Sequence, residues 1–323
     1  MEKLRRNYTC NNLLDSQIPN LVSKLQKGVY GLKQAANVWN EKLNKMLFNQ
    51  GFIKSKVDPC LYTRNKDDRL VYILMYVDDL MLCCEDQRHQ RDYFQSQQRS
   101  GNKVNHVHTS METGFHKQKE LSELLPNNQG YKEVIGKLLY LAAMTRPDIV
   151  AAVGILCRRT SSPTQRDWNG IKRVVKYLKC IEQFKFKLPS TENPILVGFT
   201  DADWAEDISD NKSTSGYVFF YGGGPINWIS RKQGSIACSS TKAEYISAAA
   251  AHDKIVWFKL LLADLKVDEP TPITLYEDNQ SCFRLSLSEK TGGHIKHIDV
   301  KHHIIREMQS EGLLQLRYCP TKT

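Results

Sequence analysis

The stretch Gly198–Glu206, read as Gly-Phe-Thr-Asp-Ala-Asp-Trp-Ala-Glu, constrains the fold of this chain more than any other. The apolar run Ile195–Val197 precedes it, so its acids come at the end of a predicted buried strand. Because side chains alternate along a strand, one face carries Ile195, Val197, Phe199 and Asp201. A carboxylate that continues an apolar face is costly unless a cation or a hydrogen-bond partner meets it. Asp201 is therefore the first candidate for a functional residue.

Length and charge limit the classes of protein and of partner. A chain of 323 residues is too long for one typical core, so two domains are expected. Its 45 Lys and Arg exceed its 35 Asp and Glu, which leaves a formal charge of +10. Such an excess favours a polyanionic partner, nucleic acid before membrane. The longest apolar run, Leu70–Val77, is far shorter than the roughly twenty residues of a membrane helix.

The cysteines and the N-terminal residues indicate the compartment. The nine cysteines are scattered and contain no C-x-x-C pair, which is typical of reduced thiols rather than a disulfide framework. The first residues are basic but lack an apolar core, so they do not form a secretory signal. An intracellular location, cytoplasmic or nuclear, is expected.

Residues 21–86 combine a helical pattern with strands. Apolar spacing over Val29–Phe48 predicts an amphipathic helix. The run Leu70–Leu82 is predicted to be two strands interrupted at Asp78 and Asp79, which would place two carboxylates at the tip of a tight hairpin. An ordinary turn is the alternative, because Asp is common in turns for local hydrogen-bonding reasons.

Residues 125–190 are predicted to be helical. Two helices are expected to meet at Thr145–Asp148, because Pro147 interrupts the apolar pattern. A third helix is expected over Thr164–Lys179, and a solvated face explains its basic residues as well as RNA binding does.

From Pro194 onward the pattern changes to strands. Strands are expected over 195–200, 216–221, 226–230, 273–276 and 313–318. A long helix from Ser239 to about Leu265 separates the third strand from the fourth, and helices precede the last one. Three antiparallel strands, a helix, a strand, helices and a final strand describe a mixed sheet flanked by helices.

Three acids of this region have ordinary structural explanations. Glu244 fits a capping box that begins at Thr241, and Asp278 fits a strand-end residue that caps the next helix. Asp201 fits a turn acid. A single fold that gathered all three would instead make a carboxylate cluster able to bind two divalent metals, and the residues alone leave both explanations open.

Several motifs together resemble the Pol polyprotein of copia-type long-terminal-repeat retrotransposons. In chain order these are Tyr30–Ala35, Tyr76–Leu80, Ile135–Tyr140, Thr145–Asp148, Arg173–Lys179, Phe199–Ala205, Lys212–Tyr217, Ser239–Tyr245, Tyr276–Gln280 and Lys296–Lys301. The resemblance covers most of residues 21–323, with a break at Gln87–Lys119.

The resemblance implies a division into five parts with an α/β (α+β) fold. A polar tail (1–20) precedes a reverse transcriptase palm fragment (21–86) and a polar linker (87–124). A helical connection (125–190) then leads to a ribonuclease H-like domain (191–323), a mixed five-stranded sheet flanked by helices that lacks its last helix.

The resemblance also implies a chemistry. Asp201, Glu244 and Asp278 match the first three catalytic acids of a ribonuclease H site, which holds two Mg²⁺ or Mn²⁺ ions and hydrolyses RNA in an RNA–DNA hybrid. Asp78 and Asp79 match remnant metal ligands of the polymerase. A fourth nuclease acid and an earlier palm acid fall outside the matching residues, so the two-metal site is expected to be incomplete. We expect DNA synthesis to be lost and the nuclease to be weak or lost. The alternative is a catalytically silent remnant that binds nucleic acid or a partner.

Four histidines suggest a metal site but do not fit zinc: His294, His297, His302 and His303. On a helix the adjacent His302 and His303 would point roughly 100° apart. No Cys or well-spaced second pair completes a zinc pattern. A helix face near nucleic acid, or plain solvent exposure, is favoured.

Overall fold

The computed structural model describes residues 9–11, 22–24, 33–66, 69–76, 79–84, 107–115, 122–191, 193–287 and 299–320. They belong to two compact units. The first comprises Met1–Ser96 and Leu260–Val267, and the second comprises Gln97–Lys259 and Asp268–Thr323. The five-part division remains a prediction.

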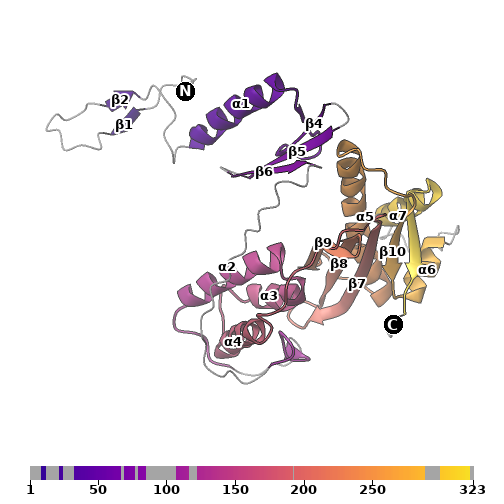
Figure 1. The fold of residues 1–323 in the computed structure, drawn as a ribbon. Coiled ribbons are helices and arrows are strands. Elements are labelled where there is room, and N and C mark those ends of the chain that lie inside the picture. The colour runs from indigo at the N-terminus through magenta and orange to yellow at the C-terminus, as the bar shows by residue number, and fades with distance from the viewer. Residues whose placement is uncertain are drawn as a thin grey trace. The chain divides into compact units, whose positions relative to one another are not determined.

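The first unit contains an antiparallel sheet with one helix packed on it (Figure 1). Its strands are hydrogen-bonded in the order β3 (Ile53–Lys54), β4 (Leu61–Lys66), β5 (Arg69–Tyr76) and β6 (Asp79–Cys84). Helix α1 (Lys33–Asn49) buries Leu43 and Leu47 against the sheet, which confirms the predicted amphipathic helix. Strands β1 (Thr9–Asn11) and β2 (Val22–Lys24) pair separately, so three strand residues lie within the predicted polar tail.

Three helices form the connection at the start of the second unit: α2 (Gln129–Met144), α3 (Val150–Cys157) and α4 (Gln165–Cys180). A short 3-10 turn, Pro147–Ile149, separates α2 from α3, as the proline predicted. Helix α4 begins with a capping box in which the Thr164 hydroxyl and the Asp167 carboxylate satisfy each other's backbone N–H groups. The core between the helices is apolar and includes Tyr131, Ile135, Leu138, Ile149, Val153, Leu156, Ile171 and Val174.

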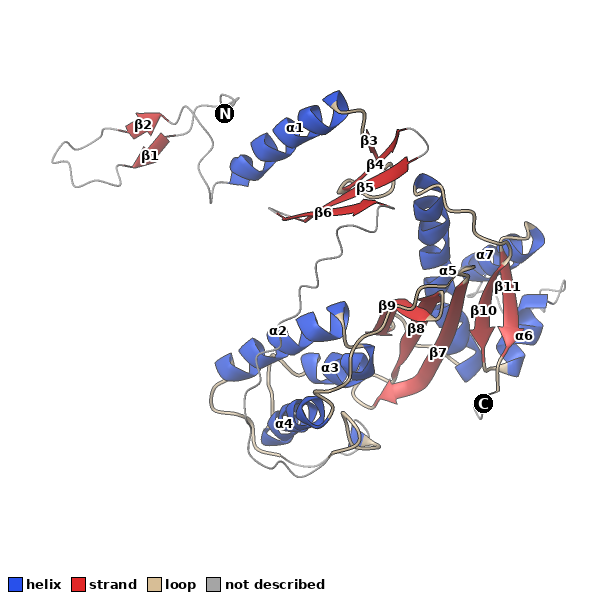
Figure 2. Cartoon of the chain, viewed as in Figure 1, coloured by secondary structure: helices blue, strands red, loops and turns tan. Residues whose placement is uncertain are grey.

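The rest of the second unit is a five-stranded mixed sheet with helices (Figure 2). Its strands are β7 (Leu196–Asp207), β8 (Lys212–Tyr221), β9 (Gly224–Lys232), β10 (Ile273–Glu277) and β11 (Leu314–Tyr318). The order is β11-β10-β7-β8-β9, antiparallel from β7 to β9 and parallel across β10. The helices are α5 (Ser240–Asp264), α6 (Gln280–Leu287) and α7 (Asp299–Ser310). This strand order and direction confirm the predicted ribonuclease H-like sheet.

The face of β7 that the sequence analysis expected to be buried, the one with Ile195 and Phe199, is the more exposed one, so that expectation was wrong. Leu196, Gly198, Thr200 and Ala202 form its buried side, whereas Ile195 is 53% exposed and Phe199 is 37% exposed. Helix α5 covers the first side, where its Phe258 ring lies 5.4 Å from that of Phe219. Gly198 has no Cβ and lets Phe219 and Leu275 of the neighbouring strands approach closely. Asp201 therefore lies on the more open face of the sheet, where Phe199 stacks on Tyr276.

Among the described residues, no helix is both long enough and apolar enough to span a membrane.

Candidate metal centre

Three elements bring three predicted acids together. Asp201 lies within β7, and the parallel strand β10 aligns Glu277 with Thr200, so Asp278 follows the strand end beside Asp201. Helix α5 contributes Glu244 one turn after its start. One carboxylate oxygen from each of Asp201, Glu244 and Asp278 lies within 4.8 Å of the others. This is the one such group of metal-binding side chains found in the part of the chain that the structure describes.

Ser247 fixes the helix to the strands at this point. Its hydroxyl is fully buried and lies 2.8 Å from the Asp201 carbonyl oxygen and 3.0 Å from that of Gly216. The Thr200 hydroxyl donates to the Ser247 oxygen at 2.9 Å. Since Ser247 is three residues beyond Glu244 on α5, these contacts hold the Glu244 side chain close to Asp201.

The three structural explanations for single acids do not hold. Ser239, not Thr241, accepts the backbone N–H of Lys242, so Glu244 lies beyond the capping-box position. Asn279, not Asp278, accepts the backbone N–H of Cys282 at the start of α6. Asp201 pairs with Gly216 inside a strand and is not in a turn.

The electrostatics of the cluster are those of crowded carboxylates. Burial, and then the charges of Glu277, Asp201 and Asp278, raise the pKa of Glu244 to about 9. Partial desolvation and the Asp278 charge also raise the pKa of Asp201. Like charges at this distance disfavour joint ionisation unless a cation neutralises them. The Glu244 carboxyl is in contact with that of Glu277, and both have a buried Oε2 that receives no hydrogen bond from any other described group. This set of oxygen ligands fits a divalent cation.

Glu277 is a fourth acid that the sequence analysis missed. It is 1% exposed, and burial raises its pKa to about 8. Its backbone partner is Asn279, whose N–H donates to Glu277 Oε1 at 3.1 Å. The alternation of Ile273, Leu275 and Glu277 on the buried face of β10 was the available signal. The Glu277 carboxyl contacts that of Glu244, and its charge when ionised helps to raise the pKa of Glu244.

The other predicted candidates lie wholly or partly outside the residues that the structure describes. Asp79 is the first residue of β6 and pairs with Tyr76, while Asp78 and the Asp79 side chain lie outside what the structure describes. His302 and His303 lie in α7 but their side chains are likewise outside the description, as are His294 and His297 entirely.

Comparison with known proteins shows which families this chain is similar to. Residues 12–109 match the family model for reverse transcriptase (RNA-dependent DNA polymerase). The chain is 30% identical over 92% of its length to the Retrovirus-related Pol polyprotein from transposon TNT 1-94 of Nicotiana tabacum. It is also 30% identical over 95% of its length to the corresponding polyprotein from transposon RE2 of Arabidopsis thaliana. It covers 26% and 24% of these two proteins, so it spans about a quarter of their length.

A solved structure of RNase H1 from Halobacterium salinarum NRC-1 aligns with 39% of this chain and 86% of its own chain. The TM-score is 0.28 and the identity 16%, so the fold assignment rests on strand order and direction.

The fold and the sequence matches together define a protein in which a reverse transcriptase region is followed by a ribonuclease H-like sheet. The chain belongs to the retrovirus-related Pol polyproteins of copia-type transposons.

Proposed function

We propose that the second unit carries a divalent-metal-dependent nuclease that hydrolyses the RNA strand of an RNA–DNA hybrid. The observation that carries this proposal is the approach of Asp201, Glu244 and Asp278 carboxylates to within 4.8 Å, from three different elements. Carboxylates are held this close against mutual repulsion most readily where a cation is bound.

Each residue has a distinct part in this proposal. Asp201 on β7 and Asp278 just after the neighbouring strand β10 would hold Mg²⁺ or Mn²⁺ together with Glu244. When bound, such ions orient a water and neutralise charge on the leaving oxygen of a phosphodiester. Ser247 holds α5 against β7 through the Asp201 carbonyl oxygen, and the Glu277 carboxyl contacts that of Glu244. With three carboxylates in the described cluster, we propose a slow enzyme.

The proposed partner is nucleic acid. The chain carries a formal charge of +10, which attracts a polyanion over long range. We propose further that Asp78 and Asp79 are remnants of a polymerase metal site and that the chain does not synthesise DNA.

Cleavage of a labelled RNA–DNA hybrid by the purified chain tests the nuclease. With Mg²⁺ or Mn²⁺ we expect slow cleavage of the RNA strand, abolished by Asp201→Asn and by Asp278→Asn. Asp268→Asn is the matched control, because Asp268 is exposed between α5 and β10 and lies outside the cluster. Cleavage that survives both cluster substitutions would refute the proposed site.

A catalytically silent nucleic-acid-binding protein is the second candidate, and the net charge favours it. It predicts hybrid binding that weakens steeply with salt, without cleavage in either metal. Primer extension on the same samples tests the proposed absence of DNA synthesis.

A further inference from the structure

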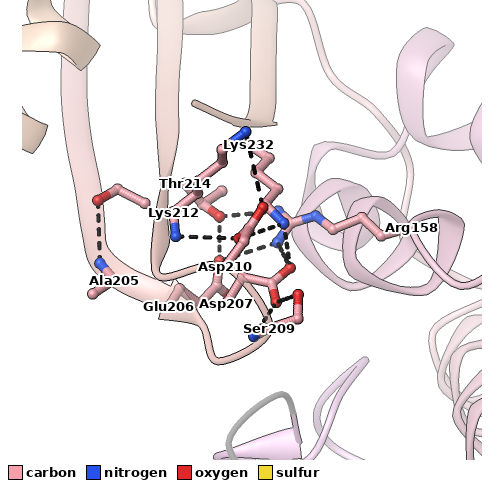
Figure 3. A network of polar contacts seen from close by, with 10 residues as sticks. Arg158, Ala205, Glu206, Asp207, Ser209, Asp210, Lys212, Thr214 and Lys232 are labelled. Atoms are coloured by element: carbon pink, nitrogen blue, oxygen red, sulfur yellow. Dashed lines mark hydrogen bonds and ion pairs between the residues drawn. The ribbon is translucent and has the colours of Figure 1, made fainter. Parts of the chain in front are cut away.

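Arg158, at the end of α3, reaches from the connection to the nuclease sheet (Figure 3). Its Nη2 donates to Thr214 Oγ1 at 2.9 Å. Its Nη1 lies 3.6 Å from Glu206 Oε2 and 3.8 Å from Asp207 Oδ2. The side chain of Arg158 is 19% exposed, so a connection residue is largely enclosed by groups of β7 and β8.

The backbone of β7 is irregular where Arg158 meets it. The pairing of β7 with β8 shifts register between Asp203 and Asp207, and Ala205 has a φ of 51°, a left-handed conformation that costs a residue with a Cβ some free energy. As a result, the consecutive residues Glu206 and Asp207 are both buried, 5% and 7% exposed. Consecutive side chains of a regular strand would point to opposite faces.

Two buried carboxylates in succession need cations. Lys232, on the edge strand β9, lies 2.7 Å from Asp207 Oδ2 and 2.8 Å from Asp210 Oδ1. Thr214 donates to Glu206, and the hydrogen bonds from Lys232 and Ser209 hold the pKa of Asp207 well below its usual range, against the effect of its burial. Lys232 pairs with the two aspartates, whereas Arg158 pairs with Glu206.

The connection touches the sheet at further points. Trp228 of β9 donates from Nε1 to the Ala142 carbonyl oxygen at 2.7 Å, and its ring lies 5.7 Å from that of Phe186. Between α3 and the sheet lies a cleft of about 560 Å³. Connection residues Pro147, Val150 and Ala151 line one wall, and Phe199, Asp201 and Asp203 line the other.

We propose that Arg158 is a positioning residue of the nuclease site, and that the connection is a working part of that site. By neutralising the irregular end of β7, Arg158 fixes the strand that carries Asp201 and keeps α3 opposite it across the cleft. This inference rests on the proposed nuclease function. It assigns a role to a helical region for which the sequence motifs indicated none.

Hydrogen exchange and Mn²⁺ titration of the full chain test the proposal, with Arg158→Ala and Arg158→Lys as the variants. In Arg158→Ala we expect amides of residues 200–214 to exchange about tenfold faster. We also expect the Kd for Mn²⁺ to rise by about three- to tenfold, below the 10- to 100-fold typical of groups that contact a metal ligand directly. Arg158→Lys keeps the charge and should recover part of both effects.

Arg173→Ala is the matched control, because Arg173 pairs with Glu112 and Thr109 of the preceding segment and, among the described residues, has no partner from β7 or β8, so both readouts should stay unchanged. Unchanged exchange over residues 200–214 in Arg158→Ala, or unchanged Mn²⁺ affinity, would overturn the positioning role. Cleavage of the hybrid by the wild-type chain would in that case still support the proposed nuclease. A wild-type chain that bound no Mn²⁺ would instead refute the proposed function, and the positioning role with it.

Discussion

At the scale of single residues, the site is defined by carboxyl groups whose pKa values are raised. Glu244 and Glu277 reach about 9 and about 8, against an unfolded value of about 4.3. In the folded protein both acids therefore retain protons that the unfolded chain releases. Their contribution to stability is fully present below about pH 4.3 and is lost as pH rises through 8 to 9.

A bound divalent cation should reverse this pH dependence, because it favours the ionised carboxylates. We expect Mg²⁺ to raise Tm by more at pH 8.5 than at pH 6, since at pH 6 the ion must displace the Glu244 proton. Thermal unfolding with and without Mg²⁺ at both pH values measures the difference. Glu244→Gln cannot ionise and should abolish most of the metal-dependent gain. An equal gain at both pH values would argue against ion binding at this cluster.

At the scale of elements, β7 is the strand on which the second unit depends. It pairs with β8 and β10, takes the cover of α5 on one side and presents Asp201 on the other. The close packing of β7 against side chains of β8 and β10 requires Gly198. A Cβ there would lie 2.6 Å from Phe219 Cε1 and 2.8 Å from Leu275 Cδ1. Phe219 and Leu275 are themselves fully buried and have little room to move.

Gly198→Ala should therefore lower the free energy of unfolding by about 1–3 kcal/mol through overpacking. Urea unfolding of the variant measures the change. Gly130→Ala, in α2, is a control with the opposite sign, because a Cβ there meets nothing within 4 Å. It should stabilise the chain by about 0.5–1 kcal/mol. A neutral Gly198→Ala would mean that the Phe219 and Leu275 side chains can move aside without cost.

At the scale of the whole molecule, the helical connection and the five-stranded sheet belong to one compact unit. The hydrogen bond from Trp228 to the Ala142 carbonyl, the Arg158 network and the shared cleft wall join them. The candidate metal centre therefore lies in a larger folded body than the five strands alone.

Trp228→Phe tests this joining with a small chemical change. The phenyl ring keeps most of the packing against Phe186 but leaves the buried Ala142 carbonyl without its donor. We expect a loss of about 1–2 kcal/mol in the free energy of unfolding, measured with urea. Trp204→Phe provides a comparison, because its Nε1 donates to Ala237 inside the nuclease sheet region. A Trp228→Phe variant as stable as wild type would indicate that the two parts are held together elsewhere.

The sequence by itself determined the family, the order of the elements and three of the acids. Local patterns carry this information: the period of two into Asp201, the helical spacing over Val29–Phe48 and the break at Pro147 are all set by neighbouring residues.

Only the tertiary structure decided which face of β7 is buried, because a period of two marks two faces without saying which one a helix will cover. It also decided that Ser239 and Asn279, rather than Thr241 and Asp278, cap their helices, since a shift of one or two residues in a helix start changes every capping role. Glu277 and Arg158 were missed for the same reason: their partners are distant in sequence, and burial and charge pairing exist only once distant segments meet.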